Sequence, residues 1–199
     1  MLDYTKRAKN YDKRWQHYCL PSFSKSLQIL DLNQDSRLLD VGCGTGIFLE
    51  ILEKKFPATE FNGIDPNQAM LAEASEKLSS KVHLETGNAE SLPYDSQSFD
   101  WVVLSNCLGH INNQEAALSE ARRVLADDGK IIITDWTRDF LTMQILNLYT
   151  QLFDYAKYNS LKSSETLEML EKLHFNCISR ESYKINWFWG LYTILAVKG

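Results

Sequence analysis

The sequence predicts a single α/β domain with a largely parallel sheet, and three observations support this prediction. The chain has 199 residues, a length that suits one hydrophobic core. Hydrophobic residues make up 44% of it and charged residues 24%, which excludes a disordered chain, a collagen-like repeat and a coiled coil. Apolar runs of strand length alternate with amphipathic stretches of helix length, an order typical of parallel strands joined by helical crossovers.

The expected elements follow this apolar pattern along the chain. Strands are expected over residues 38–41, 61–65, 82–86, 101–105 and 131–134, with helices over 47–56, 68–78 and 114–125. Further helices are expected over 140–158 and 165–173, and two late strands over 176–183 and 189–197. Because no helix separates these two strands, they predict an antiparallel C-terminal edge of the sheet.

The first 32 residues precede the first strand and predict an N-terminal helical extension. Pro21 is expected to interrupt it, because proline lacks the backbone hydrogen-bond donor. Tyr4, Tyr11 and Trp15 recur at spacings of seven and four, which places them on one helix face. That face belongs either to a lid over a site or to the core. With no internal repeat, low-complexity tract or linker, residues 1–199 are expected to form one domain.

The charge pattern narrows the function classes. A net charge of -5 and a pI near 5.4 predict no general attraction to nucleic acid or to an anionic membrane. Charged residues occupy the N-terminal positions where a signal peptide would be apolar, which predicts a cytoplasmic protein. Asp12 lies among basic residues as on a solvated helix face. The four cysteines and four histidines are isolated from one another, so neither a disulfide framework nor a metal site is expected.

The densest chemical signal is the stretch from Leu39 to Gly46, in which an apolar strand runs into three alternating glycines before a helix. Glycines let a ligand approach the backbone, and a helix N-terminus presents unpaired N–H groups. Asp65 ends the second strand, where a carboxylate can accept hydrogen bonds from two ribose hydroxyls. Together they predict a nucleotide-like ligand. NAD is the weaker alternative, because residue 47 is Ile where the dinucleotide fingerprint would need its later glycine.

Residues 40–46 resemble the first motif of the class I S-adenosylmethionine-dependent methyltransferases. The resemblance continues in order through 63–66, 87–93, 98–100 and 122–129, and it covers about residues 36–136. It implies a Rossmann-like, seven-stranded, mostly parallel sheet with helices on both faces, S-adenosylmethionine as cofactor and S-adenosylhomocysteine as product. The fourth strand ends without an Asn-Pro-Pro-Tyr-type motif, which resembles a mark of many enzymes acting on nucleic acids or proteins. Its absence favours a small-molecule acceptor.

The resemblance also implies which residues bind the cofactor. Carried over by position, they are Asp40, Gly42, Cys43, Gly44, Gly46, Asp65, Pro66, Asn88, Ala89 and Asn106. The loop residues 40–46 and Asn106 are expected at the methionyl end, Asp65 at the ribose, and Asn88 with Ala89 at the adenine. The family often has Asp where this chain has Asn88, and Asn lacks the charge, so a somewhat lower adenine affinity is expected. The plainer alternatives are turn-forming glycines, a packed Cys43 and turn-capping asparagines.

Two residues are candidate catalytic bases. His110 follows the fourth strand and has a reference pKa near 6.5, so it can remove a proton from an acceptor; packing in the loop is its alternative role. Asp135 ends the fifth strand and is the second candidate. Methyl transfer can also proceed through positioning and exclusion of water without a dedicated base.

The acceptor is expected beyond the carboxyl ends of the strands, beside residues 106–113 and 135–139. Tyr11, Trp15, His110 and Trp136 are the expected substrate-side residues. The aromatic run over 183–190 is interpreted either as core or as a wall for a ring-bearing acceptor.

The sequence therefore predicts a methyltransferase acting on a small molecule. Residues 1–32 are the expected lid or cap, 36–136 the cofactor-binding core, and 137–199 the substrate-side helices and last strands. The alternative is a non-catalytic module that binds S-adenosylmethionine or docks a partner through residues 141–158. A monomer or a homodimer is expected.

Overall fold

The computed structural model describes residues 8–153 and 158–199, which build one seven-stranded sheet in the order β3-β2-β1-β4-β5-β7-β6. The strands are β1 (Leu38–Val41), β2 (Phe61–Asp65), β3 (Val82–Thr86), β4 (Phe99–Ser105), β5 (Leu125–Trp136), β6 (Phe175–Lys184) and β7 (Gly190–Lys198). The pairs from β3 to β5 are parallel, whereas β7 runs antiparallel to both β5 and β6. The predicted mostly parallel sheet with an antiparallel C-terminal edge is confirmed.

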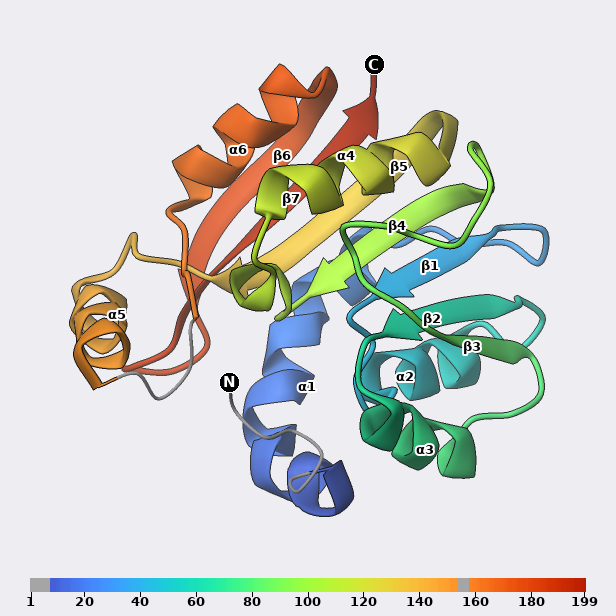
Figure 1. Cartoon of the computed structure of the whole chain (residues 1–199), viewed down its shortest axis with the longest axis horizontal. Coiled ribbons are helices and arrows are strands. Elements are labelled where there is room, and N and C mark those ends of the chain that lie inside the picture. Colours follow the sequence, from blue (N-terminus) through green and yellow to red (C-terminus); the bar gives the residue numbers. More distant parts are fainter. Residues whose placement is uncertain (1–7, 154–157) are drawn as a thin grey trace.

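Helices cover both faces of this sheet (Figure 1). They are α1 (Tyr11–Ile29), α2 (Ile47–Lys55), α3 (Gln68–Lys77), α4 (Gln114–Val124), α5 (Leu141–Phe153) and α6 (Ser163–Lys172), with 3-10 turns η1 (Ala8–Asn10) and η2 (Leu108–His110). Alternate strand residues divide the core into two layers: α4 and α6 pack on the face that contains Leu39 and Val102, and α1, α2 and α3 pack on the face that contains Leu38 and Val103.

The strand register brings the candidate site residues to one edge of the sheet. Val41 of β1 pairs with Ile64 of β2 and with Leu104 of β4, so all three strands end at the same level. The loops that follow them are therefore neighbours, although they are about 20 and 60 residues apart in the chain. In an open parallel sheet, this carboxyl edge is where ligands bind.

The prediction that Pro21 interrupts the N-terminal helix is wrong, because α1 continues through it. Proline cannot donate to the carbonyl four residues earlier, that of His17, but His17 is exposed and water can replace the lost donor. Around the proline, Ser22 Oγ donates to Cys19 O at 2.8 Å, and Ser24 Oγ donates to Pro21 O at 2.8 Å. Tyr4 lies outside the described residues.

The late elements differ from their predictions mainly at their ends. The expected helix over 140–158 is described as α5 up to Phe153, and residues 154–157 lie outside the described part. Trp187, in the aromatic run that links β6 to β7, is 80% exposed and therefore does not belong to the core. Within the described residues, no helix is both long and apolar enough to cross a membrane.

Candidate functional site

The glycine loop between β1 and α2 takes a conformation that favours glycine at three positions. Gly42, Gly44 and Gly46 have φ values of +73°, +55° and +74°. A Cβ on Gly42 would lie 2.6 Å from Cys107 Cβ, and one on Gly46 would lie 2.8 Å from Leu78 Cδ1. A Cβ on Gly44 would meet no atom within 4 Å. Gly42 and Gly46 thus permit close packing, whereas Gly44 opens onto free space.

Asp65, at the end of β2, holds this loop in place. Its Oδ2 accepts a hydrogen bond from Gly44 N at 2.9 Å, and its Oδ1 accepts one from Asn67 N at 2.8 Å. Burial raises the pKa of Asp65 above its ordinary value, and the two backbone donors oppose that rise. A carboxylate has about four acceptor positions, so Asp65 keeps capacity to accept from a ligand hydroxyl.

Asp40 is the second carboxylate at this end of the sheet. It lies in β1, its residue is only 2% exposed, and burial raises its pKa well above the ordinary value. The nearby charge of Asp65 raises it further, and no hydrogen bond from a described residue opposes the shift. A positive charge bound nearby would stabilise both carboxylates in their ionised forms.

A cavity of about 810 Å³ opens at the carboxyl ends of β1, β2 and β4. Of the expected site residues, it is lined by Tyr11, Gly42, Gly44, Asp65, Pro66, Asn88, Ala89, Asn106 and His110. Cys107, Ile111 and Asn112 also line it, within the stretch 106–113 beside which the acceptor was expected. Lining residues that the sequence reasoning did not name are Val41, Ile64, Asn67, Gln68, Ala69, Met70, Gly87 and Glu90. Most of these directly adjoin an expected residue in the chain, so a wider window around each motif would have found them.

Several expected site residues do not line this cavity. The Cys43 side chain packs in the core, where its Sγ would lie 2.9 Å from a Cβ on Gly63, and burial raises its thiol pKa. Gly46 faces α3, and Asp40 lies beneath the loop. Trp15 packs against the second core layer, with its ring centroid 6.4 Å from that of Tyr11. Cys43, Gly46 and Trp15 therefore shape the site through packing.

His110 lines the cavity from η2. Protein atoms around the imidazole lower its pKa below the ordinary value, although the residue keeps an exposed surface that limits the shift. Its ring lies edge-on to Tyr158, with 4.7 Å between the centroids. At neutral pH the imidazole is therefore neutral, and the lowered pKa makes it a weaker proton acceptor than an ordinary histidine.

The structure corrects the interpretation of Asp135 as a second candidate base. It is 2% exposed and does not line the cavity, so it has no access to an acceptor there. Its carboxylate accepts hydrogen bonds from Gly109 N at 3.0 Å, from Trp136 N at 2.7 Å and from the Tyr158 hydroxyl. Burial raises its pKa, and these donors oppose the rise. Asp135 organises the surrounding backbone.

Helix α1 holds Asn106, which sits at the end of β4 with φ +58°. Asn106 Nδ2 donates to Ser22 Oγ at 2.8 Å, and its Oδ1 accepts from Tyr18 Oη at 2.6 Å. Trp136 Nε1 in turn donates to Tyr18 Oη. Trp136 packs with Tyr18 and Trp189 in an aromatic cluster and does not line the cavity. Of the expected rim over 135–139, neither Asp135 nor Trp136 reaches the cavity.

The structure corrects the interpretation that Asp12 lies on a solvated helix face. One carboxylate oxygen accepts from Thr45 Oγ1 at 2.5 Å, and the other pairs with Lys77 Nζ. The first turn of α1 thereby contacts both the glycine loop and α3. No local sequence pattern could reveal this, because the two partners are 33 and 65 residues away.

Helix α1 contributes side chains both to the cavity and to the core. Tyr11 lines the cavity, whereas Tyr18, Phe23 and Ser26 are buried in the core. Among the described residues, no group of three or more His, Cys, Asp or Glu side chains could hold a metal ion.

Comparisons with known proteins agree with this geometry. A family described as a methyltransferase domain matches residues 39–133. The ubiquinone/menaquinone biosynthesis C-methyltransferase of Campylobacter jejuni is 36% identical over 114 residues, which are 55% of this chain and 48% of that protein. The demethylmenaquinone methyltransferase of Staphylococcus aureus is 31% identical over 162 residues, 78% of this chain and 67% of that protein. The chain thus spans about half the length of the Campylobacter relative.

Two solved structures share the fold at low sequence identity. A methyltransferase from Thermotoga maritima has a TM-score of 0.81 at 18% identity, and the match covers 98% of each chain. A Haemonchus contortus phosphoethanolamine N-methyltransferase, solved with phosphomonomethylethanolamine and S-adenosylhomocysteine, has a TM-score of 0.73 at 18% identity. That match covers 89% of this chain and 52% of the nematode protein.

Proposed function

This chain belongs to the class I S-adenosylmethionine-dependent methyltransferases, and we propose that it transfers the cofactor's methyl group to a ring carbon of a quinol. The observation that supports this acceptor most is the match to the staphylococcal demethylmenaquinone methyltransferase. Its 162 aligned residues extend well beyond the matched domain over 39–133. The Campylobacter relative is also named as a quinone C-methyltransferase. Both names favour methyl transfer over the alternative of a binding module.

The cavity residues fit the cofactor. The volume of about 810 Å³ lies within the range of roughly 300–1,000 Å³ usual for small-molecule sites. Asp65 has spare acceptor capacity for ribose hydroxyls, and the open space at Gly44 lets a ligand approach the backbone. When bound, S-adenosylmethionine supplies an electrophilic methyl group on a positively charged sulfur. The buried Asp40 and Asp65 provide the negative charge that this cation complements.

The chain contributes binding, orientation and one proton acceptor. Asn88, Ala89 and Asn106 all line the cavity. In the proposed complex, Asn88 and Ala89 flank the adenine, and Asn106 faces the methionyl part. A hydroxyl on the quinol raises the nucleophilicity of the adjacent ring carbon when it loses its proton. In the proposed reaction, a ring nitrogen of neutral His110 accepts that proton. Methyl transfer to that carbon would form the new carbon–carbon bond as the bond between sulfur and methyl breaks. The ring carbon would then lose its hydrogen as a proton to water, which restores the aromatic ring.

Residues at the mouth of the cavity complete the proposal. The first turn of α1, with Tyr11, covers the site and excludes water, which strengthens the electrostatic interactions inside it.

Helix α5 carries an exposed apolar stripe, which a homodimer would cover; it is formed by Leu141, Ile145, Leu148 and Leu152. Analytical ultracentrifugation distinguishes this dimer from a monomer.

A methylation assay tests the proposed acceptor. Purified protein is incubated with S-adenosylmethionine and a short-chain naphthoquinol that has hydrogen at the ring position to be methylated. We expect a product heavier by one methyl group and an equal amount of S-adenosylhomocysteine, both measured by mass spectrometry. His110→Gln should slow turnover about 10²–10⁴-fold, the usual contribution of a general base.

The oxidised quinone is the matched control, because it lacks the hydroxyl that activates the ring carbon. Binding of S-adenosylhomocysteine without methylation of any quinol would contradict the acceptor but not the family. A screen of cell metabolites with labelled cofactor would then identify the true acceptor class, and the absence of any labelled product would favour the binding module.

A further inference from the structure

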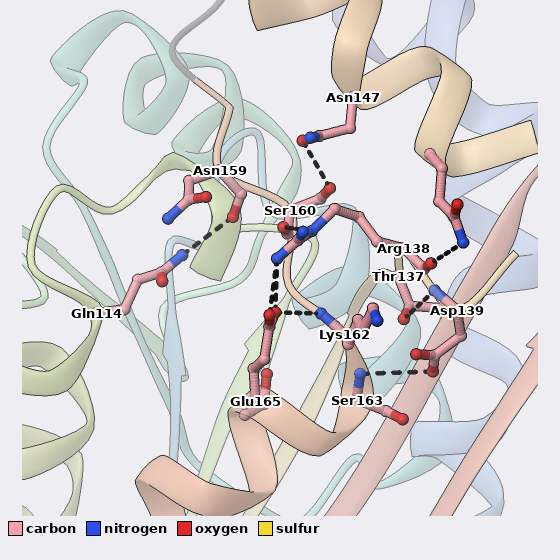
Figure 2. Close-up of polar contacts among 12 residues, drawn as sticks. Gln114, Thr137, Arg138, Asp139, Asn147, Asn159, Ser160, Lys162, Ser163 and Glu165 are labelled. Carbon is pink, nitrogen blue, oxygen red and sulfur yellow. Dashed lines mark hydrogen bonds and ion pairs between the residues drawn. The ribbon is translucent and has the colours of Figure 1, made fainter. Parts of the chain in front are cut away.

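The short segment over 158–160, which leads from α5 toward α6, is attached directly to the turn that carries His110. Asn159 N donates to Gly109 O at 2.8 Å. Gln114 Nε2 bridges the two pieces, because it donates to Leu108 O at 2.9 Å and to Asn159 O at 3.2 Å (Figure 2). The η2 turn and this segment are therefore joined by one direct hydrogen bond and by the bridging side chain of Gln114.

Gly109 provides the space for a close aromatic contact. A Cβ at this position would overlap the Tyr158 ring, so only glycine lets that ring lie against the turn. The Tyr158 ring then contacts His110 at 4.7 Å and Trp136 at 4.5 Å between centroids. Tyr158 is buried, so these rings support one side of the imidazole.

Asp135 joins the same parts through its carboxylate. Its three donors come from three places: Gly109 in η2, Trp136 at the end of β5, and Tyr158. Hydrogen bonds to a buried charged group are stronger than those between neutral groups, and losing one leaves the charge poorly solvated. The position of the His110 turn is thereby coupled to the Tyr158 hydroxyl.

The far side of the segment is fixed as well. Arg138 Nε donates to Ser160 O at 2.6 Å, and Arg138 Nη2 pairs with Glu165 at 2.7 Å (Figure 2). Ser160 Oγ donates to Asn147 Oδ1 at 3.0 Å. With both of its sides held, the segment forms a rigid support behind the turn.

We propose that Tyr158 and Asp135 are positioning residues, which act through His110 to fix the acceptor side of the cavity. Neither residue lines the cavity. The ring of Tyr158 sets the orientation of the imidazole, and its hydroxyl, through Asp135, sets the position of the Gly109 backbone. The acceptor part of this inference rests on the proposed function, whereas the support of the turn does not.

The experiment compares Tyr158→Phe with Tyr192→Phe. Each change removes one buried tyrosine hydroxyl and keeps the ring. Among the described residues, however, the Tyr192 hydroxyl bonds only to Thr166 Oγ1, at 2.9 Å, in the core under α6. Hydrogen exchange of the peptide over 107–113 is measured without any ligand. In Tyr158→Phe we expect exchange there to be about tenfold faster or more, consistent with loss of a hydrogen bond to a charged group. In Tyr192→Phe it should match the parent protein.

Kinetics give the second readout. With the naphthoquinol as acceptor, Tyr158→Phe should lower kcat about tenfold and leave the affinity for S-adenosylhomocysteine within twofold of the parent. Asp135→Asn keeps an oxygen that can accept from Gly109 N, so it should retain more activity than Asp135→Ala. If Tyr158→Phe fails to fold, hydrogen exchange over 107–113 is compared between Asp135→Asn and Tyr192→Phe instead.

Equal exchange over 107–113 in the Tyr158→Phe and Tyr192→Phe proteins would overturn the inference. So would equal losses of kcat in these two variants, because that result would indicate only a general effect on the fold. Failure of the parent protein to methylate the naphthoquinol would instead count against the proposed function. The exchange result needs no acceptor and decides the positioning role in either case.

Discussion

The two walls of the cavity are built in different ways. The wall at β1 and β2 consists of glycines with positive φ and the carboxylate of Asp65, with the buried carboxylate of Asp40 behind them, all from two short stretches of chain. The wall at η2 depends on side chains from four separate places, including Asp135, Tyr158 and Gln114. A wall made of contiguous loops suits the cofactor, which all members of a family share. In a wall assembled from distant side chains, those side chains can differ between proteins that act on different acceptors.

The largest expected effect comes from a substitution that disrupts only the wall at β1 and β2. Gly44→Val should reduce affinity for S-adenosylhomocysteine more than 100-fold, because the new side chain would occupy the open space where the ligand approaches the backbone. The positive φ adds strain of roughly 1–2 kcal/mol. Calorimetry measures the affinity, and circular dichroism checks the fold. Gly44→Ala, the smaller change, should lose less affinity, and parent-like binding in both variants would place the cofactor elsewhere.

A smaller effect is expected from Asp65→Ala. Loss of hydrogen bonds to a charged group should weaken S-adenosylhomocysteine binding by about 1.5–3 kcal/mol. Asp31→Ala, which removes an exposed carboxylate, is the matched control and should bind like the parent. If the comparison of the two walls is right, hydrogen exchange over 107–113 stays unchanged in Asp65→Ala. An affinity within twofold of the parent would show that Asp65 does not hold the ribose.

The smallest effect on cofactor binding is expected from Asp40→Asn, and this variant should stabilise the fold. Because the folded-state pKa of Asp40 is raised, ionisation destabilises the ligand-free fold as pH rises through that pKa. The neutral amide should therefore raise the free energy of unfolding at pH 7 while weakening binding of the cationic cofactor. Below the unfolded pKa, near 3.9, the two proteins should differ little in stability. Urea unfolding at pH 3 and pH 7 checks this, and a less stable variant at pH 7 would contradict it.

Sequence reasoning was most successful where a feature is local. The positions of the strands along the chain, the glycine loop and Asp65 each follow from a pattern within about ten residues, and the structure places Gly42, Gly44 and Asp65 at one cavity. It was wrong at Pro21, because an exposed carbonyl can lose its helical partner to water without ending the helix.

The second wall could not be predicted in the same way. Asp135 looked like a catalytic group because a carboxylate at a strand end often faces the ligand, yet three donors from the fold surround it. Tyr158 gave no signal, since its partners Gly109 and Asp135 lie 49 and 23 residues earlier and no short pattern links them. Asp12 was missed for the same reason.

The placement of β7 has a consequence for how the chain assembles during synthesis. Strand β7 follows β6 in the chain but lies between β5 and β6 in the sheet. A ribosome that has released β1 to β5 can let the parallel part of the sheet form, but β6 and α6 have no permanent docking place until β7 has emerged. Until then the β5 edge is unpaired and open to other strands. Closure of this edge is therefore a late event, and chaperone contact is expected to concentrate there on the nascent chain.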